Sequence, residues 1–298
     1  MDVLVSGSTG LIGTELVSAL RGKGHRVVRL VRSGGGGRDE VRWDPAAGTI
    51  EAEGLEGIGA VVHLAGEGIA EGRWTAEKKA RILDSRVQGT GLLARTIAGM
   101  STPPGVMVST SAIGYYGDRG NELLRESSPP GELFLSKVCV EWEAAAEPAR
   151  AAGIRVVHPR IGIVLSTKGG ALKQTLPIFK LGLGGKIGSG RQYWSWVTLD
   201  DVVGALVHAV ETDSLSGPVN VVAPDAPTNA EFTKVLGRVL NRPTFFPLPA
   251  PAAKLALGEV ADELLLPSAR VEPERLKETG YAYRHPDLEG AFRGLLKR

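Results

Sequence analysis

The chain has 298 residues, of which 43% are hydrophobic and 23% charged, and its net charge is +2. A chain of this size and composition can bury a large core, and the balanced charge argues against a nucleic-acid-binding protein. The single cysteine, Cys139, excludes an intramolecular disulfide, and no apolar run approaches the ~20 residues of a spanning helix, so we expect a cytoplasmic protein with no nucleic-acid or membrane partner.

The N-terminal residues predict a strand, a turn, a helix and a second strand. The segment DVLVSG (2–7) is a short β-type run, and apolar residues then recur at helical spacing from Leu11 to Leu20. Gly22 and Gly24 can end this helix, and HRVVRLVR (25–32) supplies the second strand. Together these segments predict a βαβ unit.

Three further apolar runs continue the alternation, at residues 59–66, 105–112 and 153–165. The stretches between them, 75–98 and 134–152, have helical spacing. Alternating strands and helices of this kind predict an α/β fold with a doubly wound parallel sheet.

This pattern weakens after about residue 168. The next thirty residues are rich in glycine and aromatic side chains, and prolines cluster between 243 and 251, which is typical of a lid or a lobe. We therefore expect a nucleotide-binding domain over residues 1–240, with a lid or substrate-lobe insertion at about 168–196. A small C-terminal domain would follow over residues 241–298.

Gly7, Gly10 and Gly13 form a G-x-x-G-x-x-G sequence between the first strand and the first helix. Glycine lets the backbone approach a pyrophosphate, and a helix N-terminus offers free N–H groups and a positive dipole end to that anion. The alternative is a plain tight turn. The position within a first βαβ unit favours a dinucleotide site.

The end of the second strand indicates which dinucleotide is bound. Sites for NAD usually place a carboxylate there, ~20 residues after the turn, to bind the ribose 2′-hydroxyl. Here Arg32 and Ser33 occupy that place, and the first carboxylates, Asp39 and Glu40, come later. Guanidinium and hydroxyl donors suit a 2′-phosphate, so we predict NADP(H); the alternative is that Arg32 is a solvated charge.

Four segments in order, SGSTGLIG (6–13), VVHLAG (61–66), STSAIGYYG (109–117) and PRIGIVLS (159–166), resemble the extended short-chain dehydrogenases/reductases. The chain is most similar to their atypical group called epimerase family proteins, predicted nucleoside-diphosphate-sugar epimerases with a small C-terminal domain of unknown function. The resemblance extends over nearly the whole chain. It implies an extended Rossmann fold whose cofactor site comprises Gly7, Thr9, Gly10, Leu11, Ile12, Gly13, Arg32, Leu64, Ala65, Gly66 and Arg86. For Arg86 a surface position on a long helix is the alternative.

One expected catalytic residue is missing. In the superfamily a tyrosine and a lysine four residues later perform proton transfer, helped by a serine or threonine at a strand end, and the lysine lowers the tyrosine pKa from ~10. Lys137 and Ser111 match this pattern, but Leu133 stands where the tyrosine should be, and leucine cannot carry a proton.

Two tyrosines are candidates for the missing group. Tyr115 and Tyr116 follow Ser111 on the loop at a strand's carboxyl end, where ligands bind in open α/β sheets. The resemblance places the second of them beside the substrate, and simple packing is the alternative for both rings. The catalytic candidates are thus Ser111, Tyr116 and Lys137, with Lys137 also able to bind the nicotinamide ribose or to lie solvated on its helix.

Two other kinds of site find no support in the sequence. GGKIGSG (184–190) is not a triphosphate loop, because Ile187 stands where Ser or Thr should ligate Mg²⁺. The five histidines are scattered, so we predict no metal site. Residues 191–196, which include Arg191, Trp194 and Trp196, are either a mobile segment over the substrate pocket or lobe packing.

These observations leave two functions open. The first is an NADP(H)-dependent oxidoreductase or epimerase-like enzyme with an unidentified small-molecule substrate, bound near Ser111, Tyr115, Tyr116, Arg160 and residues 191–196. The second is a non-catalytic NADP(H)-binding regulator or redox sensor, which Leu133 favours. The direction of hydride transfer and a homodimer are left open.

Overall fold

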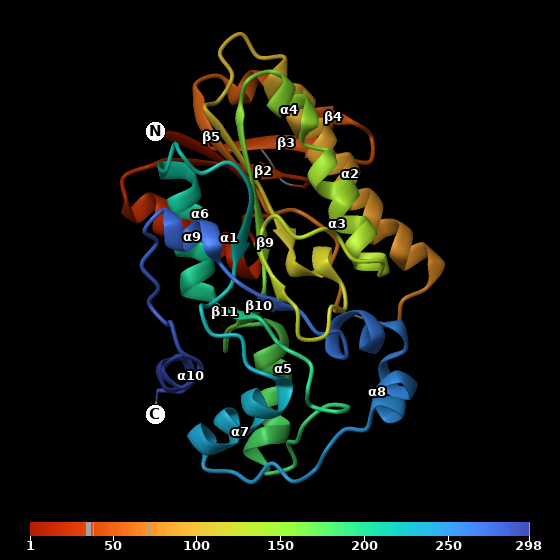
Figure 1. Ribbon diagram of the computed structural model, residues 1–298. Helices are drawn as coiled ribbons and strands as arrows, with labels where there is room; N and C mark the ends of the chain where they lie inside the picture. Colours follow the sequence, from red (N-terminus) through yellow and green to blue (C-terminus); the bar gives the residue numbers. More distant parts are fainter. Residues whose placement is uncertain (34–36, 38, 71, 298) are drawn as a thin grey trace.

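The structure is a computed structural model that describes residues 1–33, 37, 39–70 and 72–297. At its centre seven parallel strands lie in the order β12, β9, β6, β5, β1, β2, β3, which confirms the predicted doubly wound parallel sheet (Figure 1). The short strand β4 pairs antiparallel with β3, and β7 pairs with the end of β9. The strands are β1 (Asp2–Ser6), β2 (Arg26–Val31), β3 (Glu40–Asp44), β4 (Thr49–Ile50), β5 (Ile58–His63), β6 (Val106–Ser109), β7 (Ser111–Ala112), β9 (Arg155–Ile161) and β12 (Gly217–Val221).

Helices cover both faces of this sheet. Because successive side chains of a strand point to opposite sides, neighbouring residues of β1 contact different helices. Val3 and Val5 pack with α1 (Leu11–Gly22) and α6 (Leu199–Glu211), whereas Leu4 packs on the opposite face with α2 (Ala76–Ala98) and α4 (Glu147–Ala151). Helix α3 (Phe134–Ala144) lies beside α2 (Figure 1). Burial on both faces explains why the strands are continuous apolar runs.

A second, smaller unit, which we call the lobe, lies outside the central sheet. Strand β10 (Ile163–Leu165) pairs with β11 (Trp196–Thr198), and α5 (Gly170–Lys180) packs against α7 (Asn229–Leu240). Thr228 and Glu231 form a capping box that fixes the start of α7. This lobe has its own apolar cluster, which includes Leu176, Trp196 and Phe232.

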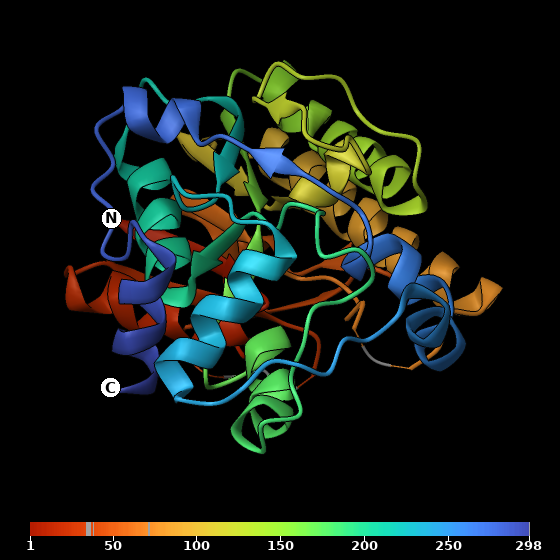
Figure 2. The ribbon, with the colours of Figure 1, turned by 60° about the horizontal axis from the view of Figure 1, so that its bottom comes forward.

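The C-terminal segment crosses the molecule from α8 (Ala250–Leu257) to α10 (Leu288–Leu296), which packs beside α7 (Figure 2). On the way it forms a π-helical turn η3 (Ala261–Leu265), strand β13 (Arg270–Val271) and helix α9 (Glu274–Glu278). Strand β13 pairs with β8 (Leu123–Leu124), and α9 contacts β12. The short 3-10 turns are η1 (Ala52–Leu55) and η2 (Ile113–Tyr116).

The small C-terminal domain expected over residues 241–298 would begin directly after α7, which ends at Leu240. The residues beyond it do not form a core by themselves, because their buried apolar side chains join clusters that also contain residues of the first 240. Leu276 packs in the core around β1, and Phe292 packs with the lobe. The C-terminal segment is therefore built into the rest of the chain.

Candidate dinucleotide site

The strand order reverses between β1 and β5, which are hydrogen-bonded neighbours in the sheet. Ligands of open α/β sheets bind outside the carboxyl ends of the strands at such a switch point. Strand β1 ends at Ser6 and β5 ends at His63. The glycine-rich turn and residues Leu64 to Gly66 therefore lie together at this point.

The three glycines of the turn are required for different reasons. Gly7 has a φ of +64°, and a Cβ there would lie 2.9 Å from the carbonyl carbon of Leu64. A Cβ on Gly13 would lie 2.1 Å from the carbonyl oxygen of Gly7, so the first turn of α1 packs directly on β1's end. Gly10 is the N-cap of α1 and brings no side-chain acceptor.

The first N–H groups of α1 therefore remain available to an anion. Residues Leu11, Ile12 and Gly13 form the first turn, whose N–H groups have no carbonyl partner within the helix. Thr9 and Gly10 are exposed beside them, and Leu11 and Ile12 are half-buried. This arrangement of a glycine turn and an uncapped helix N-terminus fits a pyrophosphate.

Ser6 holds the two strand ends together, and the sequence reasoning missed it. Its hydroxyl oxygen accepts hydrogen bonds from the N–H groups of Leu64 at 3.1 Å and Ala65 at 3.2 Å. The hydroxyl hydrogen is then left to donate to Nδ1 of His63 at 2.6 Å. The only signal in the sequence is that a hydroxyl residue ends the apolar strand.

His63 is completely buried beside this serine. Burial, assisted by the positive charge of Arg86, lowers the pKa of His63 to about 4. The imidazole is therefore neutral at physiological pH, with its proton on Nε2, which has no hydrogen-bond partner among the described residues. The ring of Trp43 packs against it in a T-shaped arrangement.

The end of β2 carries an arginine and no available carboxylate. Arg32 is exposed directly after the strand. Asp39 accepts a hydrogen bond from Nε of Arg26 at 2.8 Å, and Glu40 pairs with Arg29. Both carboxylates that follow the second strand are thus engaged by arginines of that strand. Among the described residues between β2 and β3, Arg32 is the exposed basic group.

Arg86 lies against the end of β5. A Cβ on Gly66 would be 3.4 Å from Cζ of Arg86, and Nη1 of Arg86 donates to the carbonyl oxygens of Glu67 and Ile82. Its guanidinium lies over the ring of Trp142, and burial lowers the pKa of Arg86. Of the two readings of Arg86, the structure excludes a freely solvated surface arginine.

Leu133 is the N-cap of α3, so the position of the missing tyrosine is the start of a helix. The first two N–H groups of α3, those of Phe134 and Leu135, donate to the two carboxylate oxygens of Glu263, both at 3.0 Å. Lys137 lies one turn later with an exposed side chain. The C-terminal segment thus completes the helix end at which proton transfer occurs in the superfamily.

Ser111 belongs to a buried polar network. Its hydroxyl donates to Oε1 of Glu143 at 2.7 Å, and Glu143 accepts two hydrogen bonds from Arg160, each at 2.8 Å. Nη1 of Arg160 donates to the hydroxyl of Tyr116 at 3.0 Å, and this hydroxyl donates to Oδ1 of Asn220 at 2.7 Å. The network joins β7, α3, β9, η2 and β12.

Tyr116 is fully enclosed by this network. Burial raises the pKa of Tyr116 to about 12, although the charge of Arg160 opposes the rise. The hydroxyl has no contact with solvent, so its location disfavours the predicted proton relay and favours packing. Tyr115 is the outer, half-buried ring of the pair, with Cζ of Arg160 3.4 Å from its centroid.

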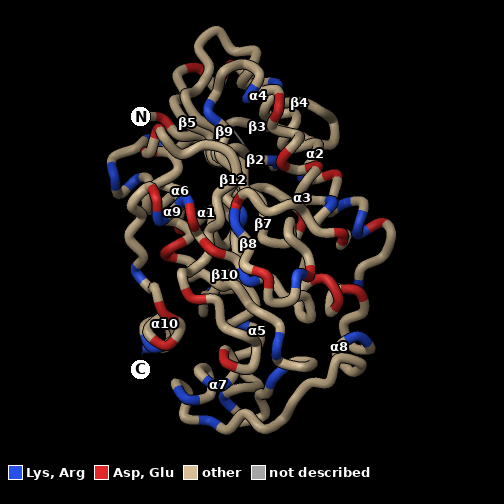
Figure 3. Tube along the Cα trace, viewed as in Figure 1, with Lys and Arg blue, Asp and Glu red and all other residues tan. Residues whose placement is uncertain are grey.

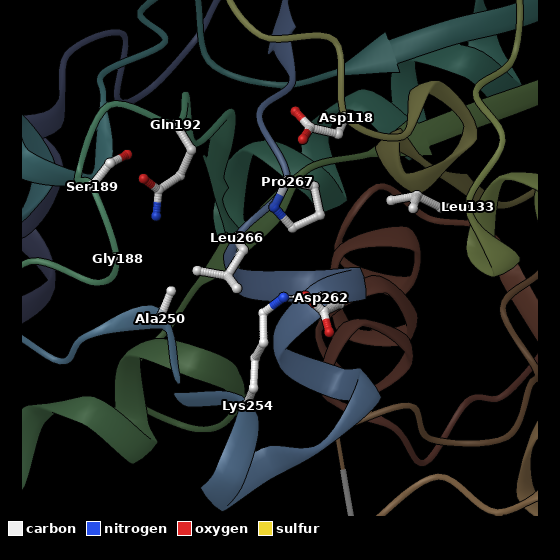
Figure 4. A pocket seen from close by; sticks show the side chains of 10 residues that line it. All are labelled: Asp118, Leu133, Gly188, Ser189, Gln192, Ala250, Lys254, Asp262, Leu266 and Pro267. Carbon is white, nitrogen blue, oxygen red and sulfur yellow. Dashed lines mark ion pairs between the residues drawn. The ribbon is translucent and has the colours of Figure 1, made fainter. Parts of the chain in front are cut away.

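A cavity of about 470 Å³ opens beside Leu133 (Figure 4). Leu133 and Asp118 line one side, and the C-terminal segment supplies the other, where Lys254 and Asp262 form an ion pair of 2.7 Å. The full lining is Asp118, Leu133, Gly188, Ser189, Gln192, Ala250, Lys254, Asp262, Leu266 and Pro267. This size suits a small-molecule ligand.

The segment at 191–196 is anchored by hydrogen bonds, which favours lobe packing over a mobile segment above the substrate pocket. Gln192 is buried and donates to the carbonyl oxygens of Ile187 and Leu265, and Nε1 of Trp194 donates to Leu265 as well. Trp196 is fully buried in the lobe cluster. These contacts support the packing alternative for the two tryptophans, while Gln192 forms part of the cavity wall.

Across the described part of the chain, His, Cys, Asp and Glu nowhere gather in groups of three or more that could hold a metal ion. None of the described helices is both long enough and apolar enough to cross a membrane.

Comparison with known proteins identifies relatives along the whole chain. The NAD dependent epimerase/dehydratase family matches residues 3–223, and a domain of unknown function, DUF1731, matches residues 248–295. The epimerase family protein Mb2239 of Mycobacterium bovis is 43% identical over 97% of this chain and 96% of its own length.

Two solved structures are similar as well. The crystal structure of human epimerase family protein SDR39U1 (isoform 2) with NADPH superposes with a TM-score of 0.92 at 38% identity and covers 100% of both chains. A nucleoside-diphosphate sugar epimerase from Corynebacterium glutamicum has a TM-score of 0.83 at 35% identity, over 99% of this chain and 58% of that one.

Proposed function

Because the chain belongs to the NAD dependent epimerase/dehydratase family, as the resemblance of its motifs predicted, we propose that it binds NADP(H) and catalyses oxidoreduction or an epimerase-like reaction. The observation that carries this proposal is the glycine turn, in which Gly13 packs on the carbonyl of Gly7 below an uncapped helix N-terminus. The human relative of known structure was crystallised with NADPH.

The choice of NADP(H) over NAD(H) rests on the end of β2. Arg32 is exposed there, whereas Asp39 and Glu40 are held by Arg26 and Arg29. A 2′-phosphate would meet a guanidinium and no competing carboxylate. Leu64, Ala65 and Gly66 would line the dinucleotide from β5, with Arg86 supporting Gly66.

The bound dinucleotide would supply or accept a hydride. The chain would supply the binding site, the orientation of the substrate and the proton. Lys137 is the titratable group of the superfamily pattern that has an exposed side chain, whereas Ser111 directs its hydroxyl to Glu143 and Tyr116 is enclosed. We assign proton transfer to a group that Lys137 positions, or to Lys137 itself.

The cavity beside Leu133 favours an uncharged substrate. Its lining holds two carboxylates, Asp118 and Asp262, and one lysine, Lys254, which is already paired with Asp262. A nucleoside diphosphate sugar would bring two phosphate charges toward this lining, where like charges repel. A neutral carbonyl compound or quinone fits the charge better.

A second function, an NADP(H)-binding regulator without chemistry, is favoured by one observation. Leu133 cannot transfer a proton, and Glu263 occupies the first N–H groups of α3 next to it. Such a protein would keep the cofactor site and use the bound state to control a partner.

Two alanines of α8 provide a matched test. Ala250 lines the cavity, whereas Ala252 is exposed on the same helix outside the lining. NADPH fluorescence would follow first binding and then oxidation with a panel of carbonyl compounds, quinones and sugar nucleotides. We expect Ala250→Trp to abolish turnover and to retain NADPH binding, with Ala252→Trp unchanged in both.

The hypothesis of a regulator without chemistry predicts a different result. NADPH would bind tightly and would not be oxidised with any compound of the panel, in the unmodified protein and in both variants. Turnover that Ala250→Trp leaves intact would place the substrate outside this cavity. Turnover with sugar nucleotides alone would contradict the inference that the substrate is uncharged, but it would still support an enzyme.

A further inference from the structure

The basic residues of this chain are unevenly distributed. Residues 166–199 and 232–258 together contain nine of the chain's 35 Lys and Arg residues and none of its 33 Asp and Glu residues. The fold brings these two segments together as α5, α7, α8 and their connections, at the lower end of Figure 3. A chain that is nearly neutral overall thus has a positive surface formed by these two segments, bounded on the α10 side of α7 by the carboxylates of Glu231 and Glu289.

Most of these cations form no ion pair with a described carboxylate. Lys168, Arg238 and Lys254 form ion pairs with Glu15, Glu289 and Asp262. Within the described residues, the remaining six have no carboxylate within ion-pair distance, and all six are exposed. They are Lys173, Lys180, Lys186, Arg191, Lys234 and Arg242.

The same end of the molecule exposes large apolar side chains. Phe245 is 82% exposed, Leu181 is 74% exposed and Phe246 is 57% exposed. We call the exposed apolar residues of this region the Phe245 patch, which consists of Ile178, Leu181, Leu183, Phe245, Phe246 and Leu248.

The patch is formed by two chain segments that lie side by side. The N–H of Phe246 donates to the carbonyl of Gly184, and the N–H of Leu248 donates to the carbonyl of Lys186 at 2.9 Å. Nε of Arg242 donates to the carbonyl of Lys180 at 2.7 Å. A Cβ on Gly185 would lie 2.0 Å from the carbonyl oxygen of Phe246. The apolar side chains are therefore held outward on a fixed backbone.

We propose that the Phe245 patch and the cations around it bind the surface of an anionic lipid bilayer. Phenylalanine and leucine side chains bury at the boundary between headgroups and acyl chains, and lysine and arginine side chains meet the phosphate groups. The absence of Asp and Glu from both segments removes the repulsion that a carboxylate would cause at such a surface.

Other occupants fit the patch less well. A second copy of the chain in a symmetric dimer would bring Lys180, Lys186 and Arg242 against the same cations, at a cost in repulsion. A nucleic acid would be bound by cations and stacking aromatic rings, but four of the six patch residues are aliphatic.

Docking in this way would bring the cavity close to the lipid. Leu248 lies two residues before the cavity residue Ala250, and Ile187, which forms a bridge with Leu248, is followed by Gly188 and Ser189 of the cavity wall. The proposal does not depend on the function of that cavity.

Sedimentation of the full chain with lipid vesicles tests this inference. We expect binding to vesicles that contain phosphatidylglycerol and none to vesicles of phosphatidylcholine alone, with binding weakened by added salt because ions screen the attraction. Lys180→Glu combined with Lys186→Glu should lower the partition coefficient by more than about tenfold. Arg21→Glu, which reverses an exposed charge on α1, is the control and should change it little.

The apolar contribution is tested by Phe245→Ser combined with Phe246→Ser, which should also abolish vesicle binding. Val140→Ser, at an exposed apolar residue of α3, is the control. If the double variant does not fold by circular dichroism, Leu181→Ser replaces it.

Three results would overturn the proposal. The first is no binding to phosphatidylglycerol vesicles at low salt. The second is binding that the serine variants leave intact, which would show attraction to diffuse charge alone. The third is a dimer in analytical ultracentrifugation that the serine variants convert to a monomer, with no vesicle binding, which would make the patch an interface between copies of the chain.

Discussion

The carboxylate of Glu143 accepts two hydrogen bonds from the guanidinium of Arg160, at 2.8 Å each, in the interior between α3 and β9. Arg160 is 2% exposed, so neither charge has much water to replace its partner. Ser111 donates to the same carboxylate. The predicted catalytic serine thus also donates a hydrogen bond to the carboxylate of a buried ion pair.

Replacing Glu143 by Gln should therefore destabilise the protein strongly. The amide keeps a hydrogen-bond acceptor but leaves Arg160 as a buried charge without a counter-charge, which costs roughly 3–5 kcal/mol of the free energy of unfolding. Urea denaturation at neutral pH measures it. Glu141→Gln, at an exposed position on the same helix, should change that free energy by less than about 0.5 kcal/mol. Equal effects of the two substitutions would contradict the assignment.

Two glycines of α1 provide a matched pair for the phosphate turn. In Gly13→Ala the new methyl group would lie 2.1 Å from the Gly7 carbonyl oxygen, so the turn must shift, at a cost of about 1–3 kcal/mol. We expect NADPH binding to be lost in a fluorescence titration. Gly22→Ala meets nothing within 4 Å and should bind NADPH normally. Normal binding by the Gly13 variant would show that the turn does not hold the pyrophosphate.

Arg32→Ala tests the choice of dinucleotide. Loss of a charge-assisted hydrogen bond to the 2′-phosphate, worth about 1.5–3 kcal/mol, should weaken NADPH binding by roughly 10- to 100-fold and leave NADH binding unchanged. Calorimetric titration with both dinucleotides measures this difference. Arg21→Ala, an exposed arginine at the far end of α1, should alter neither affinity. Equal affinities of the unmodified protein for NADPH and NADH would overturn the prediction.

Stability should fall in mild acid because of His63. Its imidazole is neutral in the folded protein, with a pKa lowered to about 4, whereas the unfolded chain takes up the proton near pH ~6.5. His63 therefore contributes stability above pH ~6.5, and this contribution, about 3 kcal/mol, is lost as the pH falls toward 4.

His63→Asn keeps an acceptor for the Ser6 hydroxyl and removes the titration. The free energy of unfolding of this variant should depend less on pH between 6.5 and 4, whatever the change at neutral pH. His285→Asn, at a partly exposed histidine, is the control and should retain the dependence of the unmodified protein. An unchanged slope in the His63 variant would assign the acid sensitivity to other groups.

The features that the sequence predicted are those set by neighbours along the chain. The strand, glycine turn and helix of residues 2–22 follow from local apolar spacing and from glycine geometry, and both are confirmed. The sequence also shows directly that Arg32, and not a carboxylate, follows the second strand. The structure adds that the later Asp39 and Glu40 are paired with arginines.

The features that were missed depend on residues far apart in sequence. Ser6 and His63 are 57 residues apart, and Glu263 reaches the start of α3 across 129 residues. The sequence left two interpretations of the segment at 191–196 open, a mobile segment or lobe packing, because it does not show the β10–β11 pairing that buries Trp196. The enclosure of Tyr116 could not be predicted either, because its hydrogen-bond partner Asn220 lies 104 residues away.

The capping of α3 by Glu263 also affects the order in which the site can form during synthesis. A nascent chain folds its N-terminal part first, so the glycine turn can be complete while residues after 240 are still being translated. The start of α3, by contrast, keeps two unsatisfied N–H groups until Glu263 has been added, and β8 has no β13 beside it until still later. The glycine turn can therefore form on the ribosome before the start of α3 receives its cap from Glu263.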